Sequence, residues 1–283
     1  MTGMHRDPLV TADWLQQNRH APDIRVVDAT WVPPFLVGRH SGSELYKRAH
    51  IQGAVYFDID AIASRETDLP HMLPDPVQFS SQVRKLGLGD GNRLVIYDNN
   101  NFYASARVWW MFRAMGHEDV LVLDGGLSAW QSIDGAIEDL PPIPVERHFT
   151  ARKRADLVRD YAQMRHLMET GETAILDARA PGRFTGEQAE PRPDLPSGHI
   201  PGSVNLPASD LLTPEGRFKS ADALQPLLAP YLDRPVVTSC GSGVSAALIA
   251  LGLARLGQWE AALYDGSWSD WASRAEAPIQ RQT

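Results

Sequence analysis

The sequence of 283 residues contains a single cysteine, Cys240, which excludes an internal disulfide and fits a reducing compartment. The first residues lack the apolar core of a signal peptide, and no run of about 18 apolar residues occurs anywhere in the chain. We therefore expect a cytoplasmic protein that does not act at a membrane.

Several kinds of binding site are also missing. The net charge is −8 and the basic residues are not clustered, which argues against a nucleic-acid partner. No Cys/His pair has metal-ligand spacing, and neither a Gly-Lys-Ser/Thr phosphate loop nor a G-x-G-x-x-G fingerprint occurs. We expect no metal and no cofactor.

Internal repeats divide the chain into two halves. Residues 26–30 match residues 175–179, and residues 49–55 match 198–204, both at an offset of 149 (177 − 28 and 199 − 50). A third pair, residues 123–130 and 264–271, follows near the end of each half. The length allows two domains. We expect domains at residues 1–135 and 156–283, joined by a proline-rich linker at 136–155.

Short apolar runs alternate with helical patterns in both halves. The expected strands cover residues 24–28, 54–57, 93–97 and 120–123, then 174–177, 203–206, 236–239 and 262–264. The expected helices cover residues 11–17, 75–87, 102–115 and 127–131, then 160–169, 221–232, 246–256 and 268–273. This alternation predicts the α/β class, with a parallel sheet covered by helices on both faces in each half.

Cys240 lies where an expected strand, 236–239, leads into an expected helix, 246–256. Gly241 and Gly243 allow positive φ angles that turn successive N–H groups toward one point, and the helix N-terminus adds its dipole. Such a nest stabilises an anion, so a nucleophilic thiolate is expected. The alternative is a lone cysteine that serves as a small buried apolar residue.

The repeat aligns Asp98 of the first half with Cys240 of the second (240 − 98 = 142). A carboxylate cannot perform thiol chemistry, so the first half is expected to be a non-catalytic copy that walls the site of the other half. Asp98 is also expected to cap the helix that follows it.

Three segments together resemble the tandem rhodanese-type sulfurtransferases over nearly the whole chain. They are residues 199–202 with their weaker copy at 50–53, the loop at Cys240, and residues 261–271. Gln52 departs from the proline usual in the family, and Asp270 departs from the usual glutamate. The resemblance implies two tandem rhodanese-like domains.

The loop after Cys240 resembles that of family members that use 3-mercaptopyruvate, which carry Gly-Ser-Gly-Val-Thr where thiosulfate-using members carry Arg and Lys. Here the loop consists of Gly241, Ser242, Gly243, Val244 and Ser245. The resemblance also implies that Arg183 and Arg192 bind the carboxylate of the donor. A planar guanidinium can bind a carboxylate through two hydrogen bonds.

A second set of residues matches family positions in the first half. The resemblance implies that Asp60 and His71 form a proton relay with Ser242, because an oriented imidazole can pass a proton toward the thiol or the leaving enolate. Asp58 could be the partner of His71 instead, and Asp60 could cap a helix. Tyr103 matches a position that lines the cleft in the family.

The expected reaction forms a persulfide at Cys240, releases pyruvate, and passes the outer sulfur to cyanide or to a thiol, such as a small dithiol protein. A thiosulfate sulfurtransferase is the first alternative. A tyrosine-type phosphatase would need arginine six positions after the cysteine, where Ala246 stands. A non-catalytic binding module is the third alternative.

Overall fold

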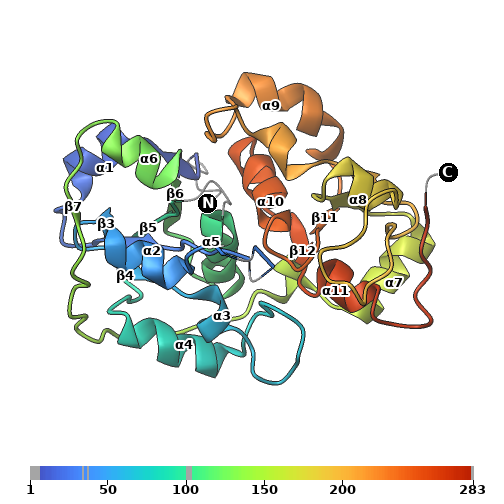
Figure 1. The fold of residues 1–283 in the computed structure, drawn as a ribbon, viewed down its shortest axis with the longest axis horizontal. Helices are drawn as coiled ribbons and strands as arrows, with labels where there is room; N and C mark the ends of the chain where they lie inside the picture. Colours follow the sequence, from blue (N-terminus) through green and yellow to red (C-terminus); the bar gives the residue numbers. More distant parts are fainter. Residues whose placement is uncertain (1–6, 34, 37, 100–103, 282–283) are drawn as a thin grey trace.

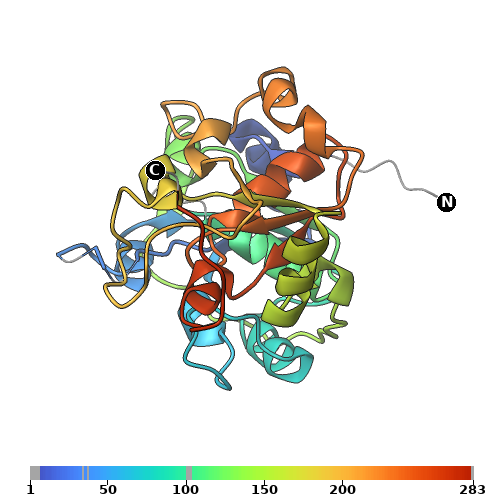
Figure 2. The same ribbon diagram turned by 90° about the vertical axis from the view of Figure 1, so that its right-hand side faces the viewer.

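The computed structural model of the chain describes residues 7–33, 35–36, 38–99 and 104–281, which form two similar halves (Figure 1). Each half contains a five-stranded sheet whose neighbouring strands are all parallel. Figure 2 looks onto the second half, whose sheet lies between helices. The α/β class expected from the sequence is confirmed.

The first half has strands β1 (Leu9–Val10), β2 (Ile24–Asp28), β4 (Val55–Tyr56), β5 (Arg93–Tyr97) and β6 (Val120–Leu123), in the order β1-β6-β5-β2-β4. Its helices are α1 (Ala12–Asn18), α2 (Gly42–Arg48), α3 (Ile59–Ile62), α4 (Pro76–Lys85), α5 (Ala104–Ala114) and α6 (Gly126–Gln131). Side-chain oxygens of Thr11 and Asp75 accept hydrogen bonds from the first N–H groups of α1 and α4, which explains where these helices begin.

The second half has strands β8 (Val158–Arg159), β9 (Ala174–Asp177), β10 (Val204–Asn205), β11 (Val236–Ser239) and β12 (Ala262–Tyr264), in the order β10-β9-β11-β12-β8. Its helices are α7 (Tyr161–Thr170), α8 (Pro181–Thr185), α9 (Ala221–Leu228), α10 (Ala246–Arg255) and α11 (Ser267–Trp271), with 3₁₀ turns at Ala155–Leu157, Ala208–Leu211 and Ala229–Tyr231. The two orders superimpose when β5 is matched to the central strand β11. Asp98 and Cys240 therefore follow equivalent strands.

Neighbouring residues of β9 point to opposite faces of the second sheet, as in any strand. Leu176 packs in the cluster that contains Leu248 of α10, whereas Ile175 packs with Met164 of α7 and Trp271 of α11. Burial of each large apolar side chain stabilises the fold by about 1.5–3 kcal/mol. The sheet is thus fixed from both sides, and the loops at its edge are held in place.

Helices α5 and α10 pack against each other across the two halves. All residues of α5 are buried, and so are Ala246 to Ala254 of α10. A helix that is covered on every side usually has small or apolar residues around its whole circumference, as α10 has, whereas α5 also buries the arginines Arg107 and Arg113. In Figure 1 this pair lies between the two sheets. Each helix begins beyond the loop that follows the central strand of its own half.

The segment between the halves is tied to the first half. Its strand β7 (Ile137–Glu138) pairs antiparallel with β3 (His50–Ile51). Residues 139–154 form no helix or strand, and their backbone bonds to the first half: Asp90 N–H donates to the His148 carbonyl (3.0 Å) and Arg152 N–H to the Met115 carbonyl (2.8 Å). The domain boundaries given above stay predictions.

The structure differs from the sequence-based expectation mainly at short elements. The helix expected at 221–232 ends at Leu228 and continues as a 3₁₀ turn, because Pro230 has no N–H to extend the α-helical bonding. Helices α2 and α8 were not expected, and α3 begins at Ile59, before the helix that Asp60 could have capped. The expected start of the helix at 102–115, and Tyr103 with it, lie outside the described residues.

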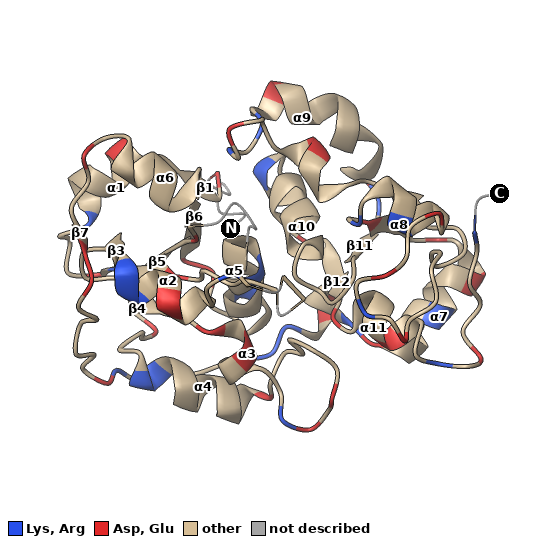
Figure 3. Cartoon of the chain, in the orientation of Figure 1, with Lys and Arg blue, Asp and Glu red and all other residues tan. Residues whose placement is uncertain are grey.

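Acidic and basic side chains are interspersed over both halves (Figure 3). Within the described part of the chain, no helix combines the length and apolar character that crossing a membrane requires.

Candidate active site

Cys240 follows β11, at the carboxyl end of the central strand, where ligands bind in open α/β sheets. Its N–H donates to Oγ of Ser267 (3.1 Å), and its carbonyl accepts from Trp268 N–H (2.9 Å). The next carbonyl, of Gly241, accepts from the N–H (2.9 Å) and Oγ (2.7 Å) of Ser269. The first turn of α11 therefore fixes the backbone at the cysteine.

Only one of the two loop glycines has the conformation that the sequence suggested. Gly243 has a φ of +79°, and a Cβ there would lie 2.7 Å from the Asp265 carbonyl oxygen. The expected positive φ at Gly241 is wrong. Gly241 leaves room for a close approach instead, since a Cβ there would lie 2.9 Å from Nη2 of Arg183 and the guanidinium would have to shift. Close approach of the guanidinium replaces backbone strain as the reason for this glycine.

The loop keeps its main-chain donors unused. Among the described residues, no protein group accepts a hydrogen bond from the N–H groups of residues 241–245. Unpaired N–H groups at a strand-to-helix turn are suited to hold an anion. The helix α10 that follows begins at Ala246 and directs its positive end toward this loop.

A pocket of about 390 Å³ opens beside Cys240 and is lined by both halves. Trp31 and Phe35 line it from the first half, and Pro207, Leu212 and Leu248 form apolar wall from the second. Gly241, Ser242, Val244 and Ser245 line it as expected, with Arg183 and Arg192. Cys240 is only 2% exposed, yet it lines this pocket. Cys240 thus belongs to the edge of an apolar cluster that is screened from bulk water, and it also borders the pocket.

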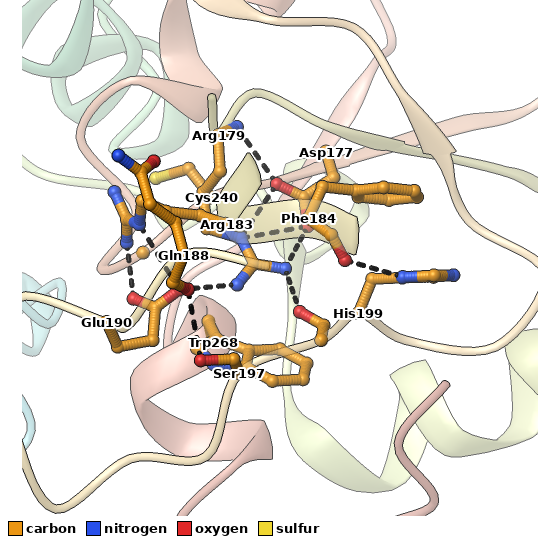
Figure 4. A network of polar contacts seen from close by, with 12 residues as sticks. Asp177, Arg179, Arg183, Phe184, Gln188, Glu190, Ser197, His199, Cys240 and Trp268 are labelled. Atoms are coloured by element: carbon orange, nitrogen blue, oxygen red, sulfur yellow. Dashed lines mark hydrogen bonds and ion pairs between the residues drawn. The ribbon is translucent and has the colours of Figure 1, made fainter. Parts of the chain in front are cut away.

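Arg183 is held by a network of charged side chains (Figure 4). Glu190 accepts hydrogen bonds from Nε (3.2 Å) and Nη2 (2.5 Å) of Arg183, and from Nη1 of Arg179 (2.9 Å). Arg179 in turn binds both carboxylate oxygens of Asp177 and lies 4.3 Å above the ring of Trp268. Burial alone would lower the pKa of Arg179, but Asp177 and Glu190 raise it above its usual range.

Arg192 lines the pocket and lies in the electrostatic field of Cys240. Burial lowers the pKa of Arg192, and the neighbouring charge of Arg183 lowers it further, while Cys240, Glu190 and Asp60 raise it. Two arginines thus border the pocket at Cys240, as the sequence predicted. Arg183 has one edge occupied by Glu190, whereas Arg192 has no comparable ion pair among the described residues.

His71 pairs with Asp60 and not with Asp58. His71 Nδ1 lies 2.5 Å from Oδ1 of Asp60, and Oδ2 of Asp60 accepts a hydrogen bond from Trp31 Nε1 (2.8 Å). Asp58 caps α3 through its Oδ1, which is the role that the sequence left open for Asp60. Partial burial would raise the pKa of Asp60, but His71, Trp31 and Arg192 outweigh it and the pKa is lowered.

The relay to Ser242 is only partly formed. His71 and Asp60 do not line the pocket, and no hydrogen bond joins His71 to Ser242 within the described chain. Nε2 of His71 is buried without a partner, so a donor or acceptor position remains free on the ring. Trp31 lies between His71 and the pocket at Cys240, because it packs edge-on against His71 (4.8 Å between ring centres) and also lines the pocket.

The equivalent loop of the first half has no nucleophile. Oδ2 of Asp98 accepts hydrogen bonds from the N–H (3.2 Å) and Oγ (2.9 Å) of Ser105, in the first turn of α5. The predicted capping role of Asp98 is confirmed. Across the described residues, no group of three or more His, Cys, Asp or Glu side chains could hold a metal ion.

Sequence reasoning missed Trp31, Arg179, Glu190 and Arg107 at or near the site. Two of them carried a usable signal: Trp31 and Arg179 follow the carboxyl ends of β2 and β9, the edge where ligands bind. Glu190 and Arg107 carried none, because a loop glutamate and a helix arginine acquire their roles only through long-range contacts.

Comparison with known proteins agrees with the motifs. The rhodanese-like domain model matches residues 11–133 and 160–274. The chain is 39% identical over 274 residues to the 3-mercaptopyruvate sulfurtransferase of Escherichia coli strain K12, covering 96% of this chain and 97% of that one. The human 3-mercaptopyruvate sulfurtransferase is 39% identical over 278 residues (94% and 92%), and the mouse thiosulfate sulfurtransferase is 36% identical over 278 residues (94% and 92%).

Among solved structures, SseA from Escherichia coli, described as a 3-mercaptopyruvate sulfotransferase with the rhodanese fold, superimposes with a TM-score of 0.84 and 36% identity, over 93% of this chain and 99% of that chain. The resemblance inferred from the loop at Cys240 and the two His-Ile-x-Gly segments is thereby confirmed. The chain belongs to the rhodanese family and consists of two tandem rhodanese-like domains.

Proposed function

We propose that this protein is a 3-mercaptopyruvate sulfurtransferase that uses Cys240 as its nucleophile. The observation that carries the proposal is a single pocket in which a cysteine, two arginines and unpaired main-chain N–H groups meet. The names of the relatives support the same donor.

In the first step the Cys240 thiolate attacks the sulfur of the donor. The sulfur–sulfur bond forms as the carbon–sulfur bond breaks, and the electron pair leaves on carbon as the enolate of pyruvate. A proton then converts the enolate to pyruvate. Arg183 and Arg192 bind the carboxylate and keto oxygen, which orients the sulfur toward Cys240. The N–H groups of residues 241–245 stabilise the negative charge of the persulfide.

In the second step a thiolate or cyanide attacks the outer sulfur of the persulfide, and the Cys240 thiolate leaves. The acceptor is cyanide or a thiol, such as a small dithiol protein. For the first step, His71, oriented by Asp60, and Ser242 supply the proton that converts the enolate to pyruvate. Phe35 lines the pocket and is 41% exposed, so we infer that the acceptor reaches the sulfur past this side chain.

A thiosulfate sulfurtransferase is the second candidate, because the mouse relative bears that name. The loop argues for the keto-acid donor, because residues 241–245 contain no cation to bind a small dianion, while Arg183 and Arg192 line the same pocket and can bind a carboxylate. Comparing kcat/KM for the two donors decides between them, and a preference for thiosulfate would overturn the donor assignment.

Mass spectrometry of the intact protein after treatment with 3-mercaptopyruvate tests the proposal. We expect the addition of one sulfur atom, its removal by cyanide, and no addition in Cys240→Ser. Ser242→Ala serves as the matched control for a change in the same loop, because it keeps the thiol and should still form the persulfide, more slowly. Failure of the unaltered protein to take up sulfur from 3-mercaptopyruvate would overturn the donor assignment, and failure with thiosulfate as well would leave the non-catalytic binding alternative.

A further inference from the structure

A buried arginine of the first half reaches the cysteine loop of the second. Arg107 lies on α5, is 0% exposed, and its Nη1 donates to the carbonyl of Gly243 at 3.3 Å. Its guanidinium also lies 4.5 Å above the ring of Trp110, which closes off its other side. This contact crosses from the half without a nucleophile to the loop that carries Cys240.

The same guanidinium holds the segment that carries His71. Nη2 of Arg107 donates to the His71 carbonyl (2.5 Å) and pairs with Oδ1 of Asp265 (2.7 Å). Oδ2 of Asp265 accepts the N–H of Leu73 (2.7 Å). Arg107 and Asp265 therefore tie together three segments: residues 71–73, the loop after β12, and the loop at Gly243.

Both carbonyls that Arg107 binds belong to residues in left-handed conformations. His71 has a φ of +60° and Gly243 a φ of +79°. For any residue with a side chain this region is uncommon, although histidine adopts it more often than most, and surrounding hydrogen bonds stabilise it. The guanidinium supplies such bonds at both residues at once, because its planar fork directs two N–H groups along fixed directions.

We propose that Arg107 is a positioning residue of the reaction: it fixes the imidazole of His71 relative to the loop of Cys240. The first half thereby acts on the chemistry of the second half through a buried cation as well as through the pocket wall. This inference rests on the proposed roles of Cys240 and His71. A purely structural role, in which Arg107 only neutralises buried Asp265, is the competing explanation.

Arg113 provides a matched control on the same helix. It is also buried, also joins the halves, and donates from Nη2 to the Trp259 carbonyl (3.1 Å) between the rings of Trp109 and Trp259. It contacts neither residues 71–73 nor the cysteine loop. Arg107→Lys and Arg113→Lys each keep a positive charge and lose the planar fork, so both should lower the melting temperature.

The test compares kcat and KM for 3-mercaptopyruvate in the two variants. Arg107→Lys should lower kcat about tenfold or more, with KM changed by less than about threefold, the size expected when an acid–base group is misplaced. Arg113→Lys should keep kcat. In Arg107→Lys combined with His71→Ala, the loss should be no greater than in His71→Ala alone, since residues that act as one unit are not additive.

Two results would overturn the inference: a kcat in Arg107→Lys equal to that of Arg113→Lys, or losses that multiply in the double variant. If Arg107→Lys is not recovered folded, Asp265→Asn tests the same set of contacts. The new amide still accepts the Leu73 N–H, but it no longer attracts the guanidinium of Arg107. An unchanged kcat in Asp265→Asn also counts against the inference. Failure of the proposed function is distinguishable, because the unaltered protein would then form no persulfide.

Discussion

Glu190 binds Arg183 through two hydrogen bonds, from Nε and from Nη2, while its first oxygen also accepts from Arg179. The four charges of Asp177, Arg179, Glu190 and Arg183 cancel within this network. Arg183 therefore offers a fixed direction for binding, with Nη1 free of hydrogen bonds to the described residues. Arg192, which forms no ion pair with the described residues, adds a second positive charge at the pocket.

The first prediction concerns Glu190→Gln. The amide keeps the shape of the side chain but loses the charge that holds Arg183. We therefore expect KM for 3-mercaptopyruvate to rise about threefold to tenfold, which corresponds to losing part of the free energy of a charge-assisted hydrogen bond. The kcat should stay within about twofold. Steady-state kinetics measure both. Glu169→Gln is the control, because its partner Arg165 is exposed and their ion pair contributes little. A fall in kcat with unchanged KM would contradict the prediction.

The second prediction concerns the arginines themselves. Arg183→Ala and Arg192→Ala should each raise KM for 3-mercaptopyruvate about tenfold to a hundredfold, as expected for loss of a hydrogen-bonded charge. Turnover with thiosulfate, which has no carboxylate, should change far less. Arg165→Ala, an exposed arginine on α7, controls for net charge. Equal losses with both donors would mean that the arginines do not bind the carboxylate.

The third prediction separates Asp60 from Asp58. Asp60→Asn removes the partner of His71 and should lower kcat about tenfold or more. Asp58→Asn weakens only the cap of α3, so it should change the melting temperature and not kcat. The pKa of Asp60 is lowered in the folded state, so its contribution to stability is present above pH ~4 and is lost as the pH falls further. The free energy of unfolding of Asp60→Asn should therefore lack this decrease below pH ~4.

The fourth prediction concerns Asp28, the counterpart of Asp177 in the first half. Oδ1 of each carboxylate accepts a hydrogen bond from the backbone N–H two residues further along the chain. In the second half that residue is Arg179, which also forms an ion pair with Asp177, whereas in the first half it is the uncharged Thr30. Burial, only partly offset by hydrogen bonds from Thr30 and Tyr97, raises the pKa of Asp28 to about 6. The folded state therefore binds the proton more tightly than the unfolded state, and stability should fall as the pH rises from about 4 to about 6.

Replacing Asp28 with asparagine should flatten this dependence and stabilise the protein at pH 7 by about 2–3 kcal/mol, the linkage expected for two pKa units. Urea unfolding at several pH values measures the effect. Asp233→Asn changes the same charge at an exposed position and should leave the pH profile unaltered. An Asp28→Asn profile that still falls between pH 4 and 6 would contradict the assignment.

The fifth prediction concerns Gly243→Ala. The new Cβ would meet the Asp265 carbonyl oxygen at 2.7 Å and Nη1 of Arg107 at 3.0 Å, at a φ of +79°. We expect a loss of about 1–3 kcal/mol in stability and a larger loss of activity. Gly202→Ala has a similar φ, +76°, with no atom within 4 Å of the new Cβ, and should lose stability alone. Activity retained in both variants would show that the loop tolerates the shift.

Much of the fold was predictable because local sequence determines it. The strands at Ile24–Asp28, Arg93–Tyr97, Ala174–Asp177 and Val236–Ser239 match the expected residues, since buried parallel strands are short, continuous apolar runs. Helices α3 and α8 are too short to produce a periodic pattern. The repeat also predicted that Asp98 and Cys240 occupy equivalent places.

The site was predictable only where motif residues lie close to Cys240 in space. The choice between Asp58 and Asp60 could not be made from sequence, because Asp58 caps α3 and Asp60 lies in its first turn, two residues apart. The hydrogen bonds of Asp60 to Trp31 and His71 are long-range contacts. The roles of Glu190 and Arg107 could be recognised only from their contacts with Arg183 and Gly243 in the folded structure. The space needed at Gly241 depends on Arg183, which arrives from a distant segment.

The packing of α5 against α10 has a consequence for how such a chain can evolve. Equivalent helices of two copies meet one another, so the molecule is organised like a homodimer whose subunits have been fused by a tether. In a true homodimer every substitution appears twice, and losing the thiol would silence both centres. Fusion removes that symmetry: the two halves can carry different residues at equivalent places, here Asp98 after β5 and Cys240 after β11.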